Sequence, residues 1–184
     1  MTPTPPHPPT PHLVLGGSRS GKSAYAEELL KPFEPPYVYV ATAQVRDEEM
    51  RERVERHRKR RNSAWETVEC PLDLPRTLQH LRRETRPILV DCLTLWLTNL
   101  LLGPNPDEAS EAVKTLCLEL RHSGAPVILV SNEVGTGIVP ENALARRFRD
   151  LAGWTNQRVA AVCSSVTLVV AGLPLELKRP AGKP

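Results

Sequence analysis

A glycine-rich stretch directly after an apolar run constrains the fold of this chain more than any other feature. Residues 16–23 read GGSRSGKS, which matches G-x-x-x-x-G-K-[ST], and they stand between the apolar run HLVL (12–15) and a helical pattern that begins at residue 22. In the order strand, loop and helix, this motif curls so that backbone N–H groups and a helix N-terminus face a phosphate. The alternative, a turn that merely joins strand to helix, does not require the complete motif. The stretch therefore predicts a loop that binds a nucleoside triphosphate.

The rest of the chain alternates between short apolar runs and helical patterns. The strands that we predict are 12–15, 37–41, 88–92, 127–131 and 166–172, with a further candidate at 64–70. The helices that we predict are 22–31, 46–61, 73–83, 93–102, 107–122 and 141–163, and the last can bend or break at Gly153. Because the strand candidates are continuous apolar runs, they fit a parallel sheet that is covered on both faces. The predicted fold class is α/β, and ligands should bind beyond the carboxyl ends of the strands.

Length and composition set the class of protein. The chain has 184 residues, of which 40% are hydrophobic and 24% charged, as expected for one globular domain. We expect this domain to span 12–178, with a disordered proline-rich tail at 1–11 and a flexible tail at 179–184. The longest apolar stretch, 88–103, is interrupted by polar residues and falls short of the roughly 20 residues that span a bilayer. The four cysteines form no C-x-x-C pair and no secretory signal is visible. These features predict a cytoplasmic protein with reduced thiols and no membrane insertion.

Three residues have a predicted role at the phosphates. Lys22 should reach the β- and γ-phosphates, and the hydroxyl of Ser23 should coordinate Mg²⁺. Asp91 follows three apolar residues at the end of a predicted strand, where a P-loop protein usually holds the carboxylate on the metal side. A helix N-cap is the alternative for Asp91, since a helical pattern starts just after it.

A third candidate site follows the strand predicted at 127–131. The segment 131–142 reads SNEVGTGIVPEN, and its Asn132 and Glu133 should emerge at the same edge of the sheet as the glycine-rich loop. The segment can bind an acceptor substrate or form a simple turn, and spacing alone favours neither.

The segment 51–61, RERVERHRKRR, holds a single histidine among seven basic and two acidic side chains. On a helix, Met50, Val54 and His57 fall at i, i+4 and i+7, so His57 continues an apolar stripe. Neighbouring positive charges should lower the pKa of His57 below its usual value of about 6.5 and leave the imidazole neutral. A neutral imidazole beside arginines can attack a phosphate and form a covalent adduct. A packed or hydrogen-bonded histidine is the simpler interpretation, and the residues alone leave both open.

The same basic segment could instead contact nucleic acid through its phosphates. The net charge of the whole chain is only +3, so the rest of the chain is slightly acidic, and aromatic residues make up only 4%. Few side chains are therefore available for base stacking, and no other basic surface segment is visible. We accordingly expect no nucleic-acid partner. A plain P-loop kinase of a small metabolite, with a structural His57, is the other alternative.

Long stretches of the chain resemble the bifunctional adenosylcobinamide kinase/adenosylcobinamide-phosphate guanylyltransferase family. The resemblance runs from about His12 to Leu177 and rests on GGSRSGKS, ATAQ, RVERHR, VDCLTLWLTNLL and above all the run SNEVGTGIVPENALARRFRDLAGWTNQRVAAV. It implies a RecA-like P-loop domain, a homotrimer and a late role in cobalamin (vitamin B12) synthesis. The implied substrates are ATP or GTP, with Mg²⁺, and adenosylcobinamide. The implied kinase step gives adenosylcobinamide phosphate, and GTP then yields a GMP–histidine intermediate that passes GMP on to give adenosylcobinamide-GDP.

The resemblance also implies site residues. The guanylylated histidine matches His57, with Lys22 as the second catalytic residue, and Arg56 stands where some relatives carry another histidine. The implied nucleotide-binding positions are those of the phosphate loop, the segment after the second strand, the stretch after the histidine and two acidic residues: Gly16, Gly17, Ser18, Arg19, Ser20, Gly21, Lys22, Ser23, Ala24, Ala43, Gln44, Val45, Arg58, Lys59, Arg60, Arg61, Glu69 and Asp91.

Overall fold

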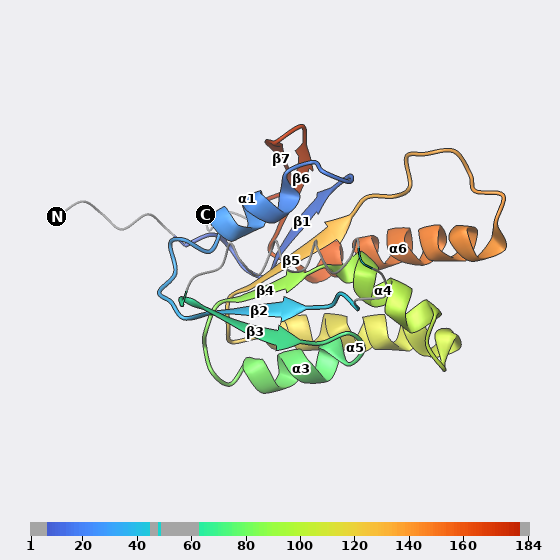
Figure 1. Ribbon diagram of the computed structural model, residues 1–184. Helices are drawn as coiled ribbons and strands as arrows, with labels where there is room; N and C mark the ends of the chain where they lie inside the picture. The colour runs from blue at the N-terminus through green and yellow to red at the C-terminus, as the bar shows by residue number, and fades with distance from the viewer. Residues whose placement is uncertain (1–6, 45–47, 49–62, 181–184) are drawn as a thin grey trace.

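The central sheet is parallel except at one edge. The computed structural model describes residues 7–44, 48 and 63–180. Within these residues seven strands form one sheet in the order β3-β2-β4-β5-β1-β6-β7, and β7 alone runs antiparallel to its neighbour. The strands are β1 (His12–Gly16), β2 (Tyr37–Ala41), β3 (Trp65–Glu69), β4 (Ile88–Asp91), β5 (Val127–Asn132), β6 (Ser165–Val170) and β7 (Leu173–Lys178). The carboxyl ends of the first six therefore meet at one edge (Figure 1).

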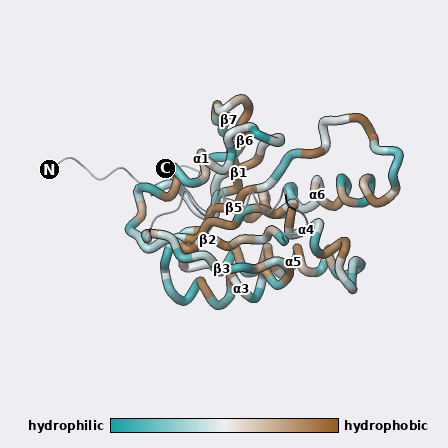
Figure 2. The backbone as a smooth tube through the Cα atoms, in the orientation of Figure 1, coloured by the Kyte–Doolittle hydropathy of each residue, from teal (hydrophilic) through white to brown (hydrophobic). Residues whose placement is uncertain are grey.

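Helices cover both faces of this sheet. Helix α1 (Lys22–Glu28) lies on one face, and the other face carries α3 (Leu74–Leu81), α4 (Leu93–Leu101), α5 (Ala109–Arg121) and α6 (Ala143–Val162), with the short 3-10 helix η1 (Pro106–Glu108) before α5 (Figure 1). Side chains alternate along β1, so Val14 packs with Ala26 of α1 while Leu13 belongs to the cluster with α3 to α6. The backbone is brown, that is hydrophobic, along the central strands in Figure 2. The predicted α/β fold with a covered, mostly parallel sheet is confirmed.

Among the described residues, the predicted elements agree with the structure except near the C-terminal strands. The strand predicted at 166–172 ends at Val170, and the sequence analysis missed β7 altogether. Ala171 and Gly172 form a turn with φ values of 52° and 80°, which is the backbone of a tight two-residue hairpin. Pro174 argues against a strand in the sequence, but an edge strand tolerates proline because one side needs no N–H donor.

Two helix predictions need comment. Helix α6 continues through Gly153, so the bend or break considered there does not interrupt it. The helix predicted at 46–61 falls outside the described residues, apart from residue 48. Among the described residues, no helix is long and apolar enough to cross a membrane.

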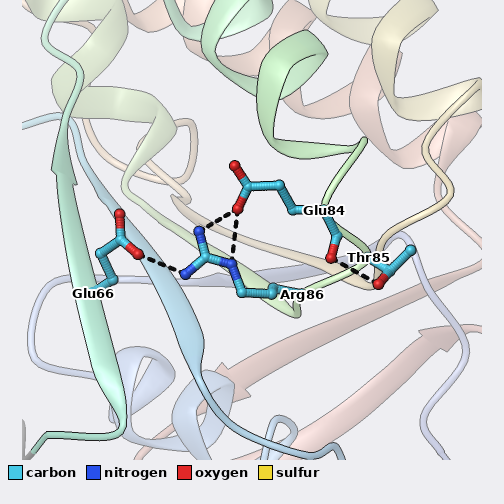
Figure 3. A network of polar contacts seen from close by, with 4 residues as sticks. All are labelled: Glu66, Glu84, Thr85 and Arg86. Atoms are coloured by element: carbon cyan, nitrogen blue, oxygen red, sulfur yellow. Dashed lines mark hydrogen bonds and ion pairs between the residues drawn. The ribbon is translucent and has the colours of Figure 1, made fainter.

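Polar contacts hold the outer parts of the fold. Arg86, just before β4, donates hydrogen bonds to Glu84 and to Glu66 of the edge strand β3 (Figure 3). At the other end, Ser164 N donates to the carbonyl of Pro11 at 2.8 Å and Ser164 Oγ donates to that of Thr10 at 2.9 Å. The last residues of the proline-rich stretch are thus bonded to the domain just before β1 begins.

Candidate nucleotide site

The glycine-rich loop has the strand–loop–helix setting that its motif predicts. It leaves β1 at Gly16 and enters α1 at Lys22, with Gly21 at the N-cap position and a φ of 94°. A Cβ atom at Gly16 would lie 2.4 Å from Ser20 Oγ and 2.6 Å from the carbonyl oxygen of Val169, so only glycine fits there. At Gly17 an added Cβ would meet no protein atom within 4 Å. Packing therefore requires glycine at 16, backbone geometry requires it at 21, and neither requires it at 17.

Lys22 folds back over the loop. Its side chain is buried, and Nζ donates a hydrogen bond to the carbonyl of Gly17 at 3.0 Å. Ser23 is half-buried, whereas Ser18, Arg19 and Ala24 are exposed. The ammonium group is thus held against the loop that it should serve, in the position from which a P-loop lysine reaches phosphate oxygens.

Asp91 is the last residue of β4, at the edge of the sheet where the loop opens. It stands in register with Ala41 of β2 and Val130 of β5, and its Oδ2 accepts a hydrogen bond from the hydroxyl of Tyr39 at 2.9 Å. The N-cap alternative for Asp91 is wrong, because Cys92 occupies the N-cap position of α4 and makes no side-chain cap bond. The carboxylate of Asp91 and the hydroxyl of Ser23 are hard oxygen donors, which suit Mg²⁺ completed by phosphate and water.

A buried clamp joins β2 to the start of α4. The hydroxyl of Thr42 donates to the carbonyl of Cys92 and accepts from the N–H of Cys92, both at 2.8 Å. Asn99, from α4, donates to the carbonyls of Thr42 and Pro71 at 2.7 and 2.9 Å. This clamp holds Ala43 and Gln44, which are half-buried, at the carboxyl edge. The sequence analysis missed Thr42 and Asn99, because their partners are distant in sequence.

A second polar cluster lies at the end of β5. Ser131 Oγ donates to Asn156 Oδ1 at 2.7 Å, and Asn156 Nδ2 donates to the carbonyl of Asn132 at 3.1 Å. The side-chain amide of Asn132 in turn donates to Thr94 Oγ1 at 2.6 Å. Asn132 pairs with Gly16 of β1, so this cluster borders the glycine-rich loop. Sequence reasoning selected Asn132 but missed Ser131, Asn156 and Thr94.

Several candidate residues lie elsewhere. Glu69 ends β3 at the same edge and is exposed, but four strand spacings, roughly 19 Å, separate β3 from β1. Glu133 uses its carboxylate within its own loop, where Oε1 accepts from Gly135 N at 2.6 Å. Val45, His57, Arg58, Lys59, Arg60 and Arg61 lie outside the described residues.

Three of the four cysteines are core residues, and Cys117 is half-buried. Cys70, Cys92 and Cys163 are buried. Burial raises the pKa of the Cys163 thiol to about 12 and also raises the pKa of Cys92. These thiols stay protonated at neutral pH, so they are poor nucleophiles and metal ligands.

A phosphate-binding loop between β1 and α1, faced by a carboxylate at the end of another parallel strand, defines a P-loop nucleotide-binding protein. The sheet resembles that of the solved structure of PH0250 from Pyrococcus horikoshii OT3, with a TM-score of 0.53 over 91% of this chain and 85% of that chain. That likeness has only 11% sequence identity and shows the fold alone.

Sequence comparison identifies the particular family. Residues 12–177 match the family model of cobinamide kinase / cobinamide phosphate guanyltransferase (CobU). The bifunctional adenosylcobalamin biosynthesis protein CobP of Pseudomonas aeruginosa is 48% identical over 166 residues, covering 90% of this chain and 96% of that protein. The bifunctional adenosylcobalamin biosynthesis protein CobU of Salmonella typhimurium is 41% identical over 179 residues, covering 90% of this chain and 98% of that protein. The chain therefore belongs to the cobinamide kinase / cobinamide phosphate guanyltransferase family, and the resemblance inferred from its motifs is confirmed.

Proposed function

We propose that this enzyme uses one phosphate-binding loop for both reactions of its family. In the kinase step, the hydroxyl oxygen of the aminopropanol arm of adenosylcobinamide attacks the γ-phosphorus of ATP or GTP. The bond from that phosphorus to the β,γ-bridging oxygen breaks, the nucleoside diphosphate leaves, and the hydroxyl proton passes to water. In the guanylyl step, GTP bound at the same loop reacts at its α-phosphorus. The observation that carries the proposal is the buried Lys22, held over the loop by the Gly17 carbonyl, on the same sheet edge as Asp91.

In the kinase step, Lys22 offsets the charge that moves onto the leaving diphosphate. Ser23 and Asp91 would hold Mg²⁺, which would supply positive charge against the phosphates. Tyr39 orients Asp91 by donating a hydrogen bond to Oδ2, and the carboxylate would be the metal ligand. The remaining loop residues, Gly16 to Ala24, with Ala43, Gln44 and Val45, form the rest of the nucleotide site.

In the guanylyl step, a ring nitrogen of His57 attacks the α-phosphorus of GTP. The bond from that phosphorus to the bridging oxygen breaks, pyrophosphate leaves, and GMP stays on the histidine as a phosphoramidate. A phosphate oxygen of adenosylcobinamide phosphate then attacks the same phosphorus and releases the imidazole. Arg58, Lys59, Arg60 and Arg61 balance phosphate charge, and Glu69 belongs to the nucleotide site in this step.

The proposal includes a cytoplasmic homotrimer. Two surfaces of the described chain support association with further copies. Leu173, Leu175 and Leu177 alternate along the edge strand β7 and are 54–72% exposed, and in the loop after β5, Ile138 is 96% exposed. Exposed apolar groups of this kind gather at protein interfaces. Light scattering on the purified chain should give three times the monomer mass, and Leu175→Glu should lower it.

Intact-mass spectrometry after treatment with GTP and Mg²⁺ tests the covalent step. The wild-type chain should gain the mass of one GMP, and label from [α-³²P]GTP should be acid-labile and alkali-stable. His57→Ala should lose the adduct, whereas His80→Ala, an exposed histidine of α3, should keep it. A His57→Ala chain that still gains GMP would refute this assignment. If the wild-type chain phosphorylates adenosylcobinamide but never gains GMP, the protein is a plain kinase and His57 has a structural role.

A further inference from the structure

The two strands that flank the phosphate-loop strand differ at the level of the loop. Gly16, where β1 meets the loop, pairs with Val169 of β6 on one side and with Asn132 of β5 on the other. Val169 is fully buried and packs in the apolar cluster under α1. Asn132 is polar and half-buried. Of these two neighbours, only β5 brings a hydrogen-bonding side chain to the loop.

Strand β5 also lies between the loop and the carboxylate strand. The sheet order places β5 directly between β1 and β4, and Asp91 of β4 is level with Val130, two residues before Asn132. Asn132 therefore lies beyond the level of Asp91 along the strands, at the carboxyl edge of the sheet. In a P-loop protein the terminal phosphate of the triphosphate lies between the loop lysine and the metal-side carboxylate. Asn132 stands on the strand that separates these two groups.

The amide of Asn132 is held in one orientation. Nδ2 donates to Thr94 Oγ1 at 2.6 Å and donates a second, weaker hydrogen bond to Cys92 Sγ at 3.7 Å. Thr94 is buried in the first turn of α4, three residues after Asp91. An amide nitrogen carries two hydrogens, and sulfur at this distance is a weak acceptor. One N–H of Asn132 is thus held by Thr94, and the other makes only a weak hydrogen bond to Cys92 Sγ, which a phosphate oxygen can replace.

A second layer fixes the backbone that carries Asn132. Asn156 of α6 is buried and bonds both to the Ser131 hydroxyl and to the Asn132 carbonyl. A carbonyl can only accept, so the nitrogen of Asn156 must face Asn132 and its oxygen must face Ser131. Glu133 N donates to the carbonyl of Gly16 at 3.1 Å, which ties the end of β5 to the start of the loop. A side chain supported in this way loses little further freedom when it binds a ligand.

We propose that Asn132 binds the γ-phosphate of the nucleotide in the kinase step, through the N–H that Thr94 does not use. Thr94 and Asn156 are its positioning residues. A phosphate oxygen is charged and makes a stronger hydrogen bond than a thiol does. A neutral amide also binds phosphate without the repulsion that a carboxylate at this position would cause. Asn132 accordingly serves the reaction at the γ-phosphorus and not the reaction at the α-phosphorus.

This inference rests on the proposed use of one loop for both steps, but a binding experiment judges it separately. Calorimetry with Mg²⁺ compares ADP with a non-hydrolysable β,γ-imido analogue of ATP. In Asn132→Ala the Kd of the analogue should rise about 10-fold or more, as for the loss of one hydrogen bond to a charged group. The Kd of ADP should stay unchanged. Asn105→Ala, which removes an exposed amide before η1, is the matched control and should change neither value.

Two further variants separate binding from structural damage. Asn132→Asp keeps the shape of the side chain, removes both N–H donors and adds a negative charge. It should therefore weaken binding of the analogue more than Asn132→Ala does. Thr94→Val removes only the hydroxyl that orients Asn132, so it should weaken the analogue less than Asn132→Ala. Unchanged ADP binding in each variant shows that the loop is intact. If Asn132→Ala weakens the binding of ADP and of the analogue equally, or weakens the binding of neither, the inference is overturned.

Activity measurements complete the test. Asn132→Ala should slow phosphoryl transfer to adenosylcobinamide by about 100-fold in kcat, as for removal of one hydrogen-bond donor to a developing charge. Labelling of the protein by [α-³²P]GTP should fall no more than about threefold, since a single hydrogen bond to a group that does not react contributes to binding rather than to the barrier. Equal losses in both reactions would contradict the assignment to the γ-phosphate. If the wild-type chain takes no label, the His57 proposal fails, and the ADP–analogue comparison still decides the role of Asn132.

Discussion

The two edges of the sheet bury polar groups in different ways. At the carboxyl edge, Thr42 donates a hydrogen bond to Cys92 and accepts one from Asn99. Asn132 donates a hydrogen bond to Thr94. At the amino edge, His12 is buried with one bond, from Nε2 to Thr167 Oγ1 at 2.9 Å, and its Nδ1 has no partner within the described residues. The carboxyl edge is thus a connected network that can position groups around a charged ligand. The amino edge tolerates one histidine only because that histidine stays neutral.

The largest predicted effect is the loss of activity when Lys22, at the carboxyl edge, is replaced. Lys22→Met keeps the length of the side chain and removes the charge, so phosphoryl transfer should slow by about 10³-fold. The urea midpoint of unfolding should change little, because Gly17, whose carbonyl loses its donor, is exposed and can bind water instead. Lys31→Met, just beyond α1 with an exposed ion pair to Glu28, should change neither. Phosphoryl transfer by Lys22→Met at the wild-type rate would show that the loop lacks the proposed function.

The carboxyl-edge network should also contribute to stability. Asn99→Ala leaves the buried carbonyl of Thr42 and the partly buried carbonyl of Pro71 without their donor, which should reduce the free energy of unfolding by about 3 kcal/mol. Urea unfolding measures this change, and Asn105→Ala at an exposed position is the control. A loss of less than about 0.5 kcal/mol, the range of ordinary surface substitutions, would mean that the clamp is not a stabilising unit.

At the amino edge, the contribution of His12 to the free energy of unfolding should depend on pH. Burial lowers the pKa of His12 from 6.5 to about 4, and the nearby Glu176 carboxylate offsets part of that effect. Between these values the unfolded chain binds the proton and the folded chain does not, so stability falls as the pH drops below 6.5 and stops falling below about 4. From pH 7 to pH 5, His12 should cost the folded state about 2 kcal/mol.

Urea unfolding at both pH values tests this contribution. His12→Gln should flatten the pH dependence, while His80→Gln, at an exposed position, should leave it as in the wild type. Identical pH slopes for the wild type and His12→Gln would contradict the proposal that His12 is held neutral.

The smallest effect is expected where a polar network lies on the surface. Arg86 lies between Glu66 and Glu84, and both glutamate side chains are about half exposed (Figure 3). Arg86→Ala should reduce stability by only about 0.5 kcal/mol, and less in about 1 M salt, because exposed ion pairs are screened. A loss that matches that of Asn99→Ala would remove the distinction between buried and exposed networks.

Local sequence patterns predicted much of the fold. The apolar runs mark β1, β2, β4 and β5, because a strand that is buried on both faces needs apolar side chains in succession. Strand β7 was not predicted from the sequence because it lies at an edge, where Pro174 is tolerated and three leucines remain exposed. Its existence depends on the turn at Ala171 and Gly172 and on pairing with β6.

In the candidate site, too, local sequence patterns reveal some residues and not others. The glycine-rich loop, Lys22 and Asp91 are visible in the sequence because their chemistry depends on short spacing and on position at a strand end. Asn156 and Asn99 are not, since each acts on a carbonyl more than 20 positions away along the chain. No periodicity or motif connects such partners.

The sequence alone determined the α/β class, the phosphate-binding loop and the family, because these depend on neighbouring residues and on a long specific run of motifs. Only the tertiary structure decided that Asn132 borders Gly16, that Asp91 belongs to the strand and not to a helix cap, and that Thr42 and Asn99 form a clamp. The physical reason is that strand order and register bring together side chains whose separation along the chain carries no local signal.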